Sequence, residues 1–225
     1  GPGTIHYHDI GDYLSREEKL AIIEDFGSIQ RVPWQTITPN DSYDWINQRS
    51  EDFQELNPLT GSKNAIFAIR SNGLKTQRDT WAYNFSRSAL AKNINQHIQF
   101  FESEVKRLSS DLNSIPSQKE REEFVEKAVR ENDRKGKWTT ALKQDVARQR
   151  AEPFDDDQIT DATYRPFAKQ NLYYSRLLNE RRYQIPAIFP TPEYENLVIQ
   201  VTGTGATKDF STLISRQMPD LEVIS

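Results

Sequence analysis

The 225-residue chain has 36% hydrophobic and 28% charged residues and a formal net charge of -4, a balance typical of a folded globular protein with a large polar surface. It contains no cysteine, which excludes disulfides, thiolate metal sites and a cysteine nucleophile. No stretch approaches the about 20 apolar residues of a membrane span, so we expect a cytoplasmic protein without a membrane partner.

The first 62 residues predict one short helix followed by an irregular segment. A capping box from Ser15 to Glu18 precedes an apolar periodic stretch, and Gly27 is a typical stop, which together predict a helix over residues 15–26. Residues 28–62 are rich in Pro, Asn, Asp and Ser, a composition typical of a partly helical connector. We expect a domain boundary at its end.

The next segment predicts two strands. The apolar run 65–69 indicates a buried strand, Ser71-Asn72-Gly73 a turn, and residues 80–85 a second strand. The two strands would form a hairpin or a strand–loop–strand unit.

A helical region follows. Ser86 is a predicted N-cap, and apolar residues recur every three or four positions from Leu90 to Leu108, which predicts a long amphipathic helix ending near Asn113. A capping box beginning at Ser117 predicts a second helix to about residue 132, and residues 139–148 predict a short basic third. We expect these helices to form a long insertion over residues 88–150.

The remaining sequence returns to strands. Residues 171–175, 194–202 and 221–224 are strand candidates, whereas Ile185-Pro186 and residues 189–192 predict extended loops. The expected fold class is therefore α+β, with a mixed sheet, flanking helices and a long helical hairpin insertion. The final residues resemble an interrupted strand, so we expect a fragment truncated at its C-terminus.

Charge is unevenly distributed along this acidic chain. Residues 1–62 carry 4 basic and 11 acidic side chains, whereas residues 63–92 carry 6 and 1. Residues 130–150 carry 7 basic and 3 acidic side chains, and residues 164–182 carry 5 and 1. Separate basic segments on an acidic chain indicate a local polyanion-binding face, although ordinary surface clustering would produce a similar pattern.

Two segments combine bases, amides and aromatics in the manner of DNA-reading proteins. Arg and Lys suit guanine edges or phosphates, and Asn and Gln can pair with adenine. Alternating Trp81, Tyr83 and Phe85 are more simply explained as one face of a half-buried strand. The DNA-binding candidates in residues 71–87 are Lys75, Thr76, Gln77, Arg78, Asn84 and Arg87, and those in residues 172–183 are Arg176, Asn179, Arg181 and Arg182.

Other motifs give weaker signals. The segment from Gly203 to Lys208 lacks the spacing of a nucleotide-binding loop, so we interpret it as a flexible turn in which Lys208 contacts DNA phosphate. Residues 155–157 are three aspartates, more typical of a helix cap than of a cation site. No Cys and no further nearby His completes a zinc site with His6 and His8. We therefore predict no catalytic, cofactor-binding or metal residues in this chain.

The combination of motifs resembles the C-terminal specificity region of type ISP restriction-modification enzymes. The segment 5–20 is similar to the chain leaving the adenine methyltransferase domain of that family. The motifs that carry the resemblance are Ser71-Asn72-Gly73, the run from Arg78 to Ser86, Tyr164-Arg165-Pro166-Phe167, the stretch from Leu172 to Pro186, and Ile188-Phe189-Pro190.

The resemblance implies that residues 1–62 connect to a methyltransferase domain and that residues 63–225 are a DNA target-recognition domain. The chain would recognise duplex DNA sequences without being an enzyme itself. Adenine methylation, ATP-driven activity and cleavage, with S-adenosylmethionine, ATP and Mg as cofactors, would belong to other domains of the same polypeptide. The alternative is a structural coupler whose basic segments dock the methyltransferase and helicase-like domains.

Overall fold

The computed structural model describes residues 3–41, 43–46, 51–61, 63–203 and 209–224. The chain divides into two units, Gly1–Pro58 and Leu59–Ser225. The division falls four residues before the boundary expected at residue 62. Within the described ranges, no helix is long and apolar enough to cross a membrane.

The first unit contains a short antiparallel strand pair and one helix. Strand β1 (Ile5–Tyr7) pairs with β2 (Gln35–Ile37), and 3-10 helices occupy Ile29–Arg31 and Glu51–Glu55. Helix α1 (Arg16–Phe26) has the predicted capping box, in which Ser15 Oγ accepts from the Glu18 amide and the Glu18 carboxylate accepts from the Ser15 amide. Gly27 ends it in the left-handed conformation, with φ 64°. The prediction for residues 15–26 is therefore confirmed.

The second unit is built on a mixed sheet, as predicted. Antiparallel β3 (Tyr83–Asn84), β5 (Ala168–Tyr173) and β4 (Ile159–Arg165) lie in the order β3-β5-β4, and β8 (Met218–Pro219) pairs with β4 in parallel. A separate hairpin consists of β6 (Val198–Val201) and β7 (Thr212–Ser215).

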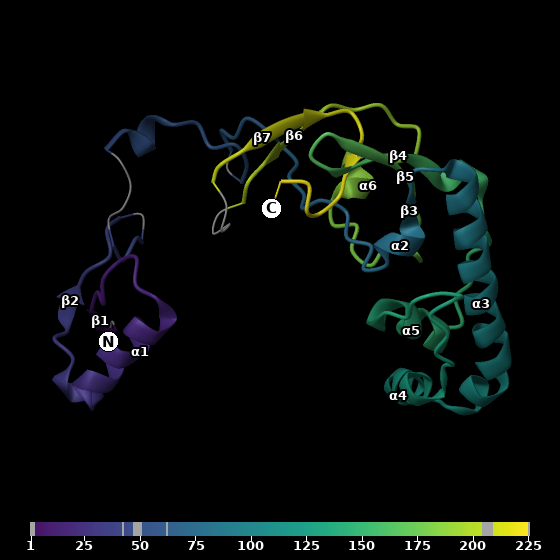
Figure 1. The fold of residues 1–225 in the computed structure, drawn as a ribbon, viewed down its shortest axis with the longest axis horizontal. Coiled ribbons are helices and arrows are strands. Elements are labelled where there is room, and N and C mark those ends of the chain that lie inside the picture. The colour runs from purple at the N-terminus through teal and green to yellow at the C-terminus, as the bar shows by residue number, and fades with distance from the viewer. Residues whose placement is uncertain (1–2, 42, 47–50, 62, 204–208, 225) are drawn as a thin grey trace. The chain divides into compact units, whose positions relative to one another are not determined.

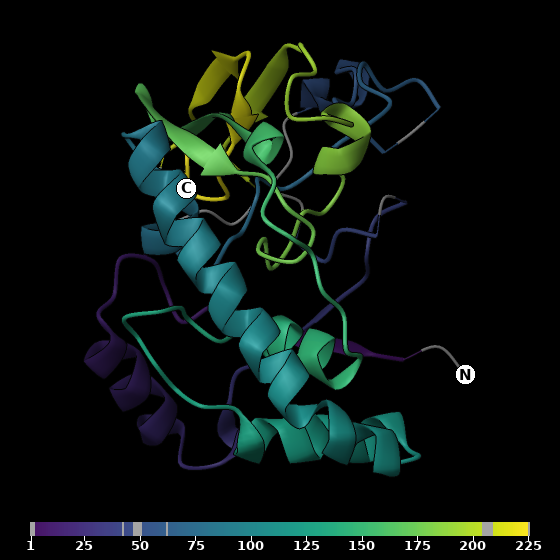
Figure 2. The same ribbon diagram turned by 90° about the vertical axis from the view of Figure 1, so that its right-hand side faces the viewer.

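A long helix extends from this sheet. Helix α3 (Arg87–Ser114) begins at the predicted N-cap Ser86. Helices α4 (Gln118–Ala128) and α5 (Thr140–Ala147) lie against its C-terminal half, as Figures 1 and 2 show. The short helices are α2 (Asp79–Ala82), the 3-10 turn Asp156–Gln158 and α6 (Ile185–Ile188). The predicted helical insertion is present, although α4 ends at Ala128 rather than near residue 132.

Two apolar cores hold these layers together. The larger joins the buried face of α3 to α4, α5 and one end of the sheet, and the smaller lies around β3, β4, β5 and α6. The larger core includes Leu90, Ile94, Ile98, Phe101, Leu108, Leu112, Val125, Leu142, Val146, Ile159, Tyr173 and Leu178. The smaller includes Leu74, Ala82, Tyr83, Ala162, Leu172, Tyr174, Ile185, Phe189 and Met218.

Several strand predictions were wrong. Residues 65–69 form no strand, and Ile66 and Ile69 are 59% and 48% exposed. Residues 79–82 are helical, so only Tyr83 and Asn84 of the second predicted strand pair with the sheet. Residues 221–224 form a turn rather than a strand. Ile185-Pro186 opens a helix instead of a loop because proline is tolerated in the first turn.

Candidate nucleic-acid interface

The two predicted DNA-binding segments meet in the fold. Lys75 and Arg181 exchange backbone hydrogen bonds, each with an N···O distance of 2.9 Å. Tyr83 and Leu172 face each other across β3 and β5. The basic segments 63–92 and 164–182 are therefore joined by backbone pairing.

The cationic and amide side chains of the two paired segments that reach solvent make up the candidate interface, which we call the junction surface: Lys75, Gln77, Arg176, Arg181 and Arg182. Gln77, Arg176 and Arg181 are exposed, whereas Lys75 and Arg182 are half-buried. The Arg182 guanidinium lies 5.8 Å from the centre of the Tyr174 ring. The side chains of Lys75, Arg176 and Arg181 make no hydrogen bond or ion pair with any residue that the structure describes. These cations are therefore available to an external anion.

Arg78 lies beneath this surface rather than on it. Its side chain is 0% exposed and donates hydrogen bonds to the Leu178 carbonyl and, at 2.7 Å, to Thr139 Oγ1. Burial lowers its pKa to about 10, an effect that Glu180, 4.0 Å away, partly opposes. Arg78 is still a cation at neutral pH. In this conformation the guanidinium is committed to the interior, and the contact of Arg78 with DNA stays a prediction.

Thr76 and Asn179 are also buried, at 1% and 3% exposure. Thr76 Oγ1 donates to Asp79 and accepts from the Arg78 amide. Asn179 accepts from the Ser175 amide at 2.8 Å and donates to the Tyr173 carbonyl at 3.1 Å, which closes the turn bearing Arg176. In this conformation both side chains support the turns around them, and their contacts with DNA stay predictions.

Asn84 and Arg87 have partners at the start of α3. Asn84 Oδ1 accepts from the Ser86 amide at 2.9 Å. Arg87 donates to the Ile159 carbonyl at 2.9 Å and pairs with Asp156 at 2.7 Å, although 49% of its side chain is exposed. These contacts tie α3 to β4. Lys208, the remaining candidate, lies outside the described residues.

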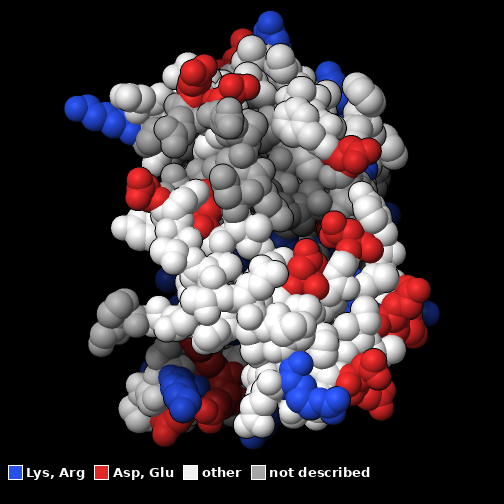
Figure 3. Space-filling model, turned by 90° about the vertical axis from the view of Figure 1, so that its left-hand side faces the viewer, with Lys and Arg blue, Asp and Glu red and all other residues white. Residues whose placement is uncertain are grey.

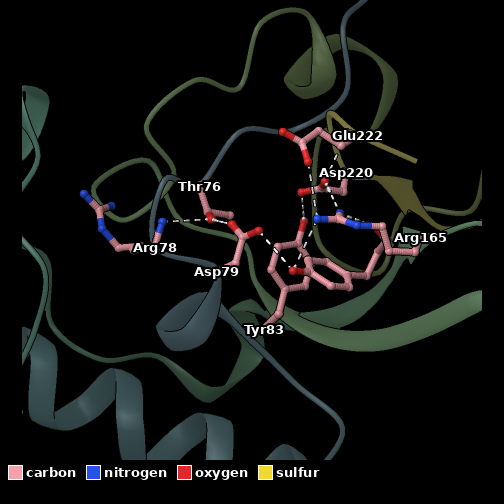
Figure 4. A network of polar contacts seen from close by, with 8 residues as sticks. Thr76, Arg78, Asp79, Tyr83, Arg165, Asp220 and Glu222 are labelled. Atoms are coloured by element: carbon pink, nitrogen blue, oxygen red, sulfur yellow. Dashed lines mark hydrogen bonds and ion pairs between the residues drawn. The ribbon is translucent and has the colours of Figure 1, made fainter. Parts of the chain in front are cut away.

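A polar network supports the junction surface (Figure 4). The Asp220 carboxylate accepts from Tyr83 at 3.1 Å and from Arg165 at 2.9 Å. Tyr164 donates to Asp79 at 3.2 Å. Burial is the largest cause of the raised pKa of Asp220, and the repulsion from Asp79 adds to it. The network fixes residues 74–79 against the sheet.

Gly73 permits a close backbone approach within this support. A Cβ atom at Gly73 would lie 2.2 Å from the Asp220 carbonyl oxygen. The approach allows Leu74 to donate to the Pro219 carbonyl and to accept from the Leu221 amide, both at 2.8 Å. Lys75, the next residue along the chain, then pairs with Arg181. Ser71-Asn72-Gly73 therefore supplies close packing rather than the predicted turn.

A second group of residues, which no sequence motif indicated, lines a groove in the second unit. A groove of about 280 Å³ lies between the β4–β5 turn and β7. Its lining consists of Thr163, Phe167, Lys169, Leu213, Ile214, Ser215, Arg216 and Gln217. A larger groove of about 680 Å³ mixes Arg87 and Arg216 with Asp161, Glu193 and Glu195. Those carboxylates make the larger groove less suited to a phosphate chain.

The arrangement of ionisable groups does not form a metal centre. Across the described ranges, no group of three or more His, Asp or Glu side chains is placed to hold a metal ion. Asp155 instead caps the Asp156–Gln158 turn, with its side chain accepting from the Asp157 amide at 3.0 Å. Figure 3 shows one face on which Asp and Glu side chains form several patches and the Lys and Arg side chains are isolated from one another.

Comparisons with known proteins agree with this geometry. Residues 65–225 match the family described as the Type ISP C-terminal specificity domain. A nuclease-deletion mutant of the Type ISP restriction-modification enzyme LlaGI, in complex with a DNA substrate mimic, is 38% identical, with a TM-score of 0.78 over 98% of this chain and 21% of that chain.

Two further solved structures are similar. The ATP-dependent Type ISP restriction-modification enzyme LlaBIII bound to DNA is 30% identical, with a TM-score of 0.67 over 98% of this chain and 14% of that chain. The DrdV-DNA complex is 26% identical, with a TM-score of 0.73 over 98% and 21%. No curated protein sequence matches. The chain spans about a fifth or less of the solved proteins to which it is similar.

Proposed function

Because this chain belongs to the Type ISP C-terminal specificity domain family, we propose that it recognises the sequence of duplex DNA for a longer, ATP-dependent restriction-modification enzyme. The proposal is supported by the backbone pairing of Lys75 with Arg181, which gathers the basic segments into one surface. It is also supported by the LlaGI and LlaBIII structures, which are complexes with a DNA substrate mimic and with DNA.

The junction surface has the chemistry needed for both parts of recognition. Arg176 and Arg181 are exposed cations that can neutralise phosphates or donate two hydrogen bonds to guanine. Gln77, two residues after Lys75, is also exposed and can pair with adenine in the major groove. Its left-handed backbone, with φ 57°, projects from a turn whose next residue, Arg78, is buried. Recognition of nucleobase edges requires exposed polar side chains that buried residues hold in fixed positions, as Arg78 does for this turn.

We assign methylation, ATP hydrolysis and cleavage to other parts of a longer protein, together with S-adenosylmethionine, ATP and Mg. Those groups would supply the methyl donor, the energy source and the phosphate-binding cation. The described part of this chain has no clustered set of metal ligands, and its sequence lacks the motifs that bind the two nucleotides. Its role in the reaction would be to place the DNA.

A selection from a pool of random 30-base-pair duplexes tests the proposal. A recognition domain enriches one recurrent sequence, and Gln77→Ala together with Arg176→Gln changes or weakens that sequence preference. A protein that binds only phosphate would retain DNA without enriching any sequence. A structural coupler would retain no DNA, and either result would contradict the proposal.

A further inference from the structure

The β4–β5 turn exposes an aromatic side chain in an unfavourable backbone conformation. Phe167 is 90% exposed, and its φ is +62°, in the left-handed region. Glycine or asparagine is favoured at such a turn position, whereas a bulky residue is an outlier there. The turn thus keeps a large apolar ring in solvent at a steric cost that glycine would avoid. Such outliers concentrate at functional sites.

The surroundings of Phe167 are cationic. Lys169 and Arg216 line the same groove, and neither side chain makes a hydrogen bond or ion pair with the residues that the structure describes. The described lining of this groove contains no Asp or Glu, and its polar members are Thr163, Ser215 and Gln217. An exposed aromatic ring therefore shares a groove with two unpaired cations, and the described lining has no carboxylate to neutralise them.

This turn is connected to the junction surface by short contacts. Arg165, the last residue of β4, donates to Asp220 at 2.9 Å. Asp220 in turn pairs with Leu74, whose neighbour Lys75 pairs with Arg181. The β4–β5 turn and the junction surface therefore share one rigid support.

We propose that Phe167 is a wedge that stacks on the bases of the bound DNA, while Lys169 and Arg216 neutralise phosphates on either side. The proposal rests on the function proposed above and adds a contact that reads no base edge. Apolar wedges of this kind insert between base steps and kink the duplex. Stacking accepts every base because each has a π face. The wedge would therefore position the DNA, and the junction surface would read its sequence.

Glycine at this position separates a DNA contact from a role in folding. In the full protein, Phe167→Gly relieves the left-handed strain and removes no buried contact, so we expect unfolding at the same or a higher urea concentration. The same variant should bind the selected duplex about tenfold more weakly, since stacking is lost. A role in folding would move stability and binding in the same direction.

Phe85→Ala is the matched control, because Phe85 is also a highly exposed phenylalanine, at 77%, and does not line the groove. The second readout is the fluorescence of 2-aminopurine placed in turn at each adenine of the selected duplex except the one that is methylated, because methyltransferases flip their target base. We expect an increase at one position with the wild-type protein and with Phe85→Ala, and no increase with Phe167→Gly.

Three results would overturn the wedge. The first is equal DNA affinity for wild-type protein and Phe167→Gly. The second is a 2-aminopurine signal that Phe167→Gly leaves unchanged, and the third is a wild-type complex without such a signal at any adenine. In all three cases wild-type protein still binds DNA, so the proposed function survives. A wild-type protein that binds no duplex would overturn both proposals.

Discussion

The guanidinium of Arg78 donates a hydrogen bond to the backbone carbonyl of Leu178, 100 positions further along the chain. The same guanidinium donates to Thr139, the N-cap of α5, and lies 4.0 Å from Glu180. One buried cation therefore joins the start of α5 to the turn that carries Arg176 and Arg181. This contact gives the junction surface a fixed shape.

Replacing Arg78 by Met should destabilise the protein by about 3–5 kcal/mol, because it leaves the largely buried Glu180 carboxylate without its cation. Arg78→Met with Glu180→Gln should recover part of this loss, since both charges are then gone. Urea unfolding measures the change. Arg176→Met is the control on the exposed part of the same turn and should alter stability by no more than about 0.5 kcal/mol. Equal unfolding midpoints for Arg78→Met and Arg176→Met would refute the structural role.

The buried His97 should make stability depend on pH. Burial, with a smaller contribution from Arg78, lowers its pKa to about 3, and Nδ1 has no hydrogen-bond partner. Unfolding restores an ordinary pKa near 6.5, so the unfolded chain binds a proton that the folded protein does not. The free energy of unfolding should therefore fall as pH decreases from about 6.5 towards 3, by up to about 1.4 kcal/mol per pH unit.

Urea unfolding at pH 7, 6 and 5 tests this dependence. His97→Gln should flatten the decline, whereas His6→Gln, a control in the first unit, should leave it unchanged. The interpretation fails when the His97→Gln protein loses stability as steeply as wild type does.

Gly73→Ala tests the close approach beneath Lys75. The new methyl group would meet the Asp220 carbonyl oxygen at 2.2 Å, and a backbone atom cannot move aside as a flexible side chain can. We expect a loss of about 1–3 kcal/mol, as for other overpacked sites. Gly203→Ala is the control, because no atom of the described residues lies within 4 Å of its added Cβ. Comparable thermal midpoints for the two variants would show that the backbone approach is not required.

The helices could be predicted from sequence because their signals are local. Ser86 caps α3, Thr139 caps α5 and the Ser15 capping box opens α1, each within a few residues of the helix it stabilises. The strand pattern was less informative. β4 mixes Ile159 with Thr160, Asp161 and Thr163, and its pairing depends on β5 and on the distant β8. Such tertiary contacts are not visible in local periodicity.

The sequence indicated the segments that carry the candidate site but not which of their side chains are exposed. Arg176, Arg181 and Gln77 are exposed as a DNA contact requires. Arg78 has the same local character, yet it is buried because Thr139, Leu178 and Glu180 come from other segments. Phe167 is uncharged and did not stand out among the basic residues of the sequence. Its exposure is visible only in the geometry of the β4–β5 turn. Positive charge in the sequence therefore indicates which segments reach the junction surface, but not which of their side chains are exposed there.

The salt dependence of DNA binding tests the central claim most directly. Each cation that neutralises a phosphate adds about one to the slope of log affinity against log salt concentration. We expect the affinity of wild-type protein for a 30-base-pair duplex to fall as salt concentration rises. The double variant Arg176→Gln, Arg181→Gln should reduce the magnitude of this slope by about two. Lys119→Gln with Lys127→Gln removes the same charge from the exposed side of α4 and should leave the slope unchanged. Absence of DNA binding, or an equal reduction in both double variants, would contradict the account.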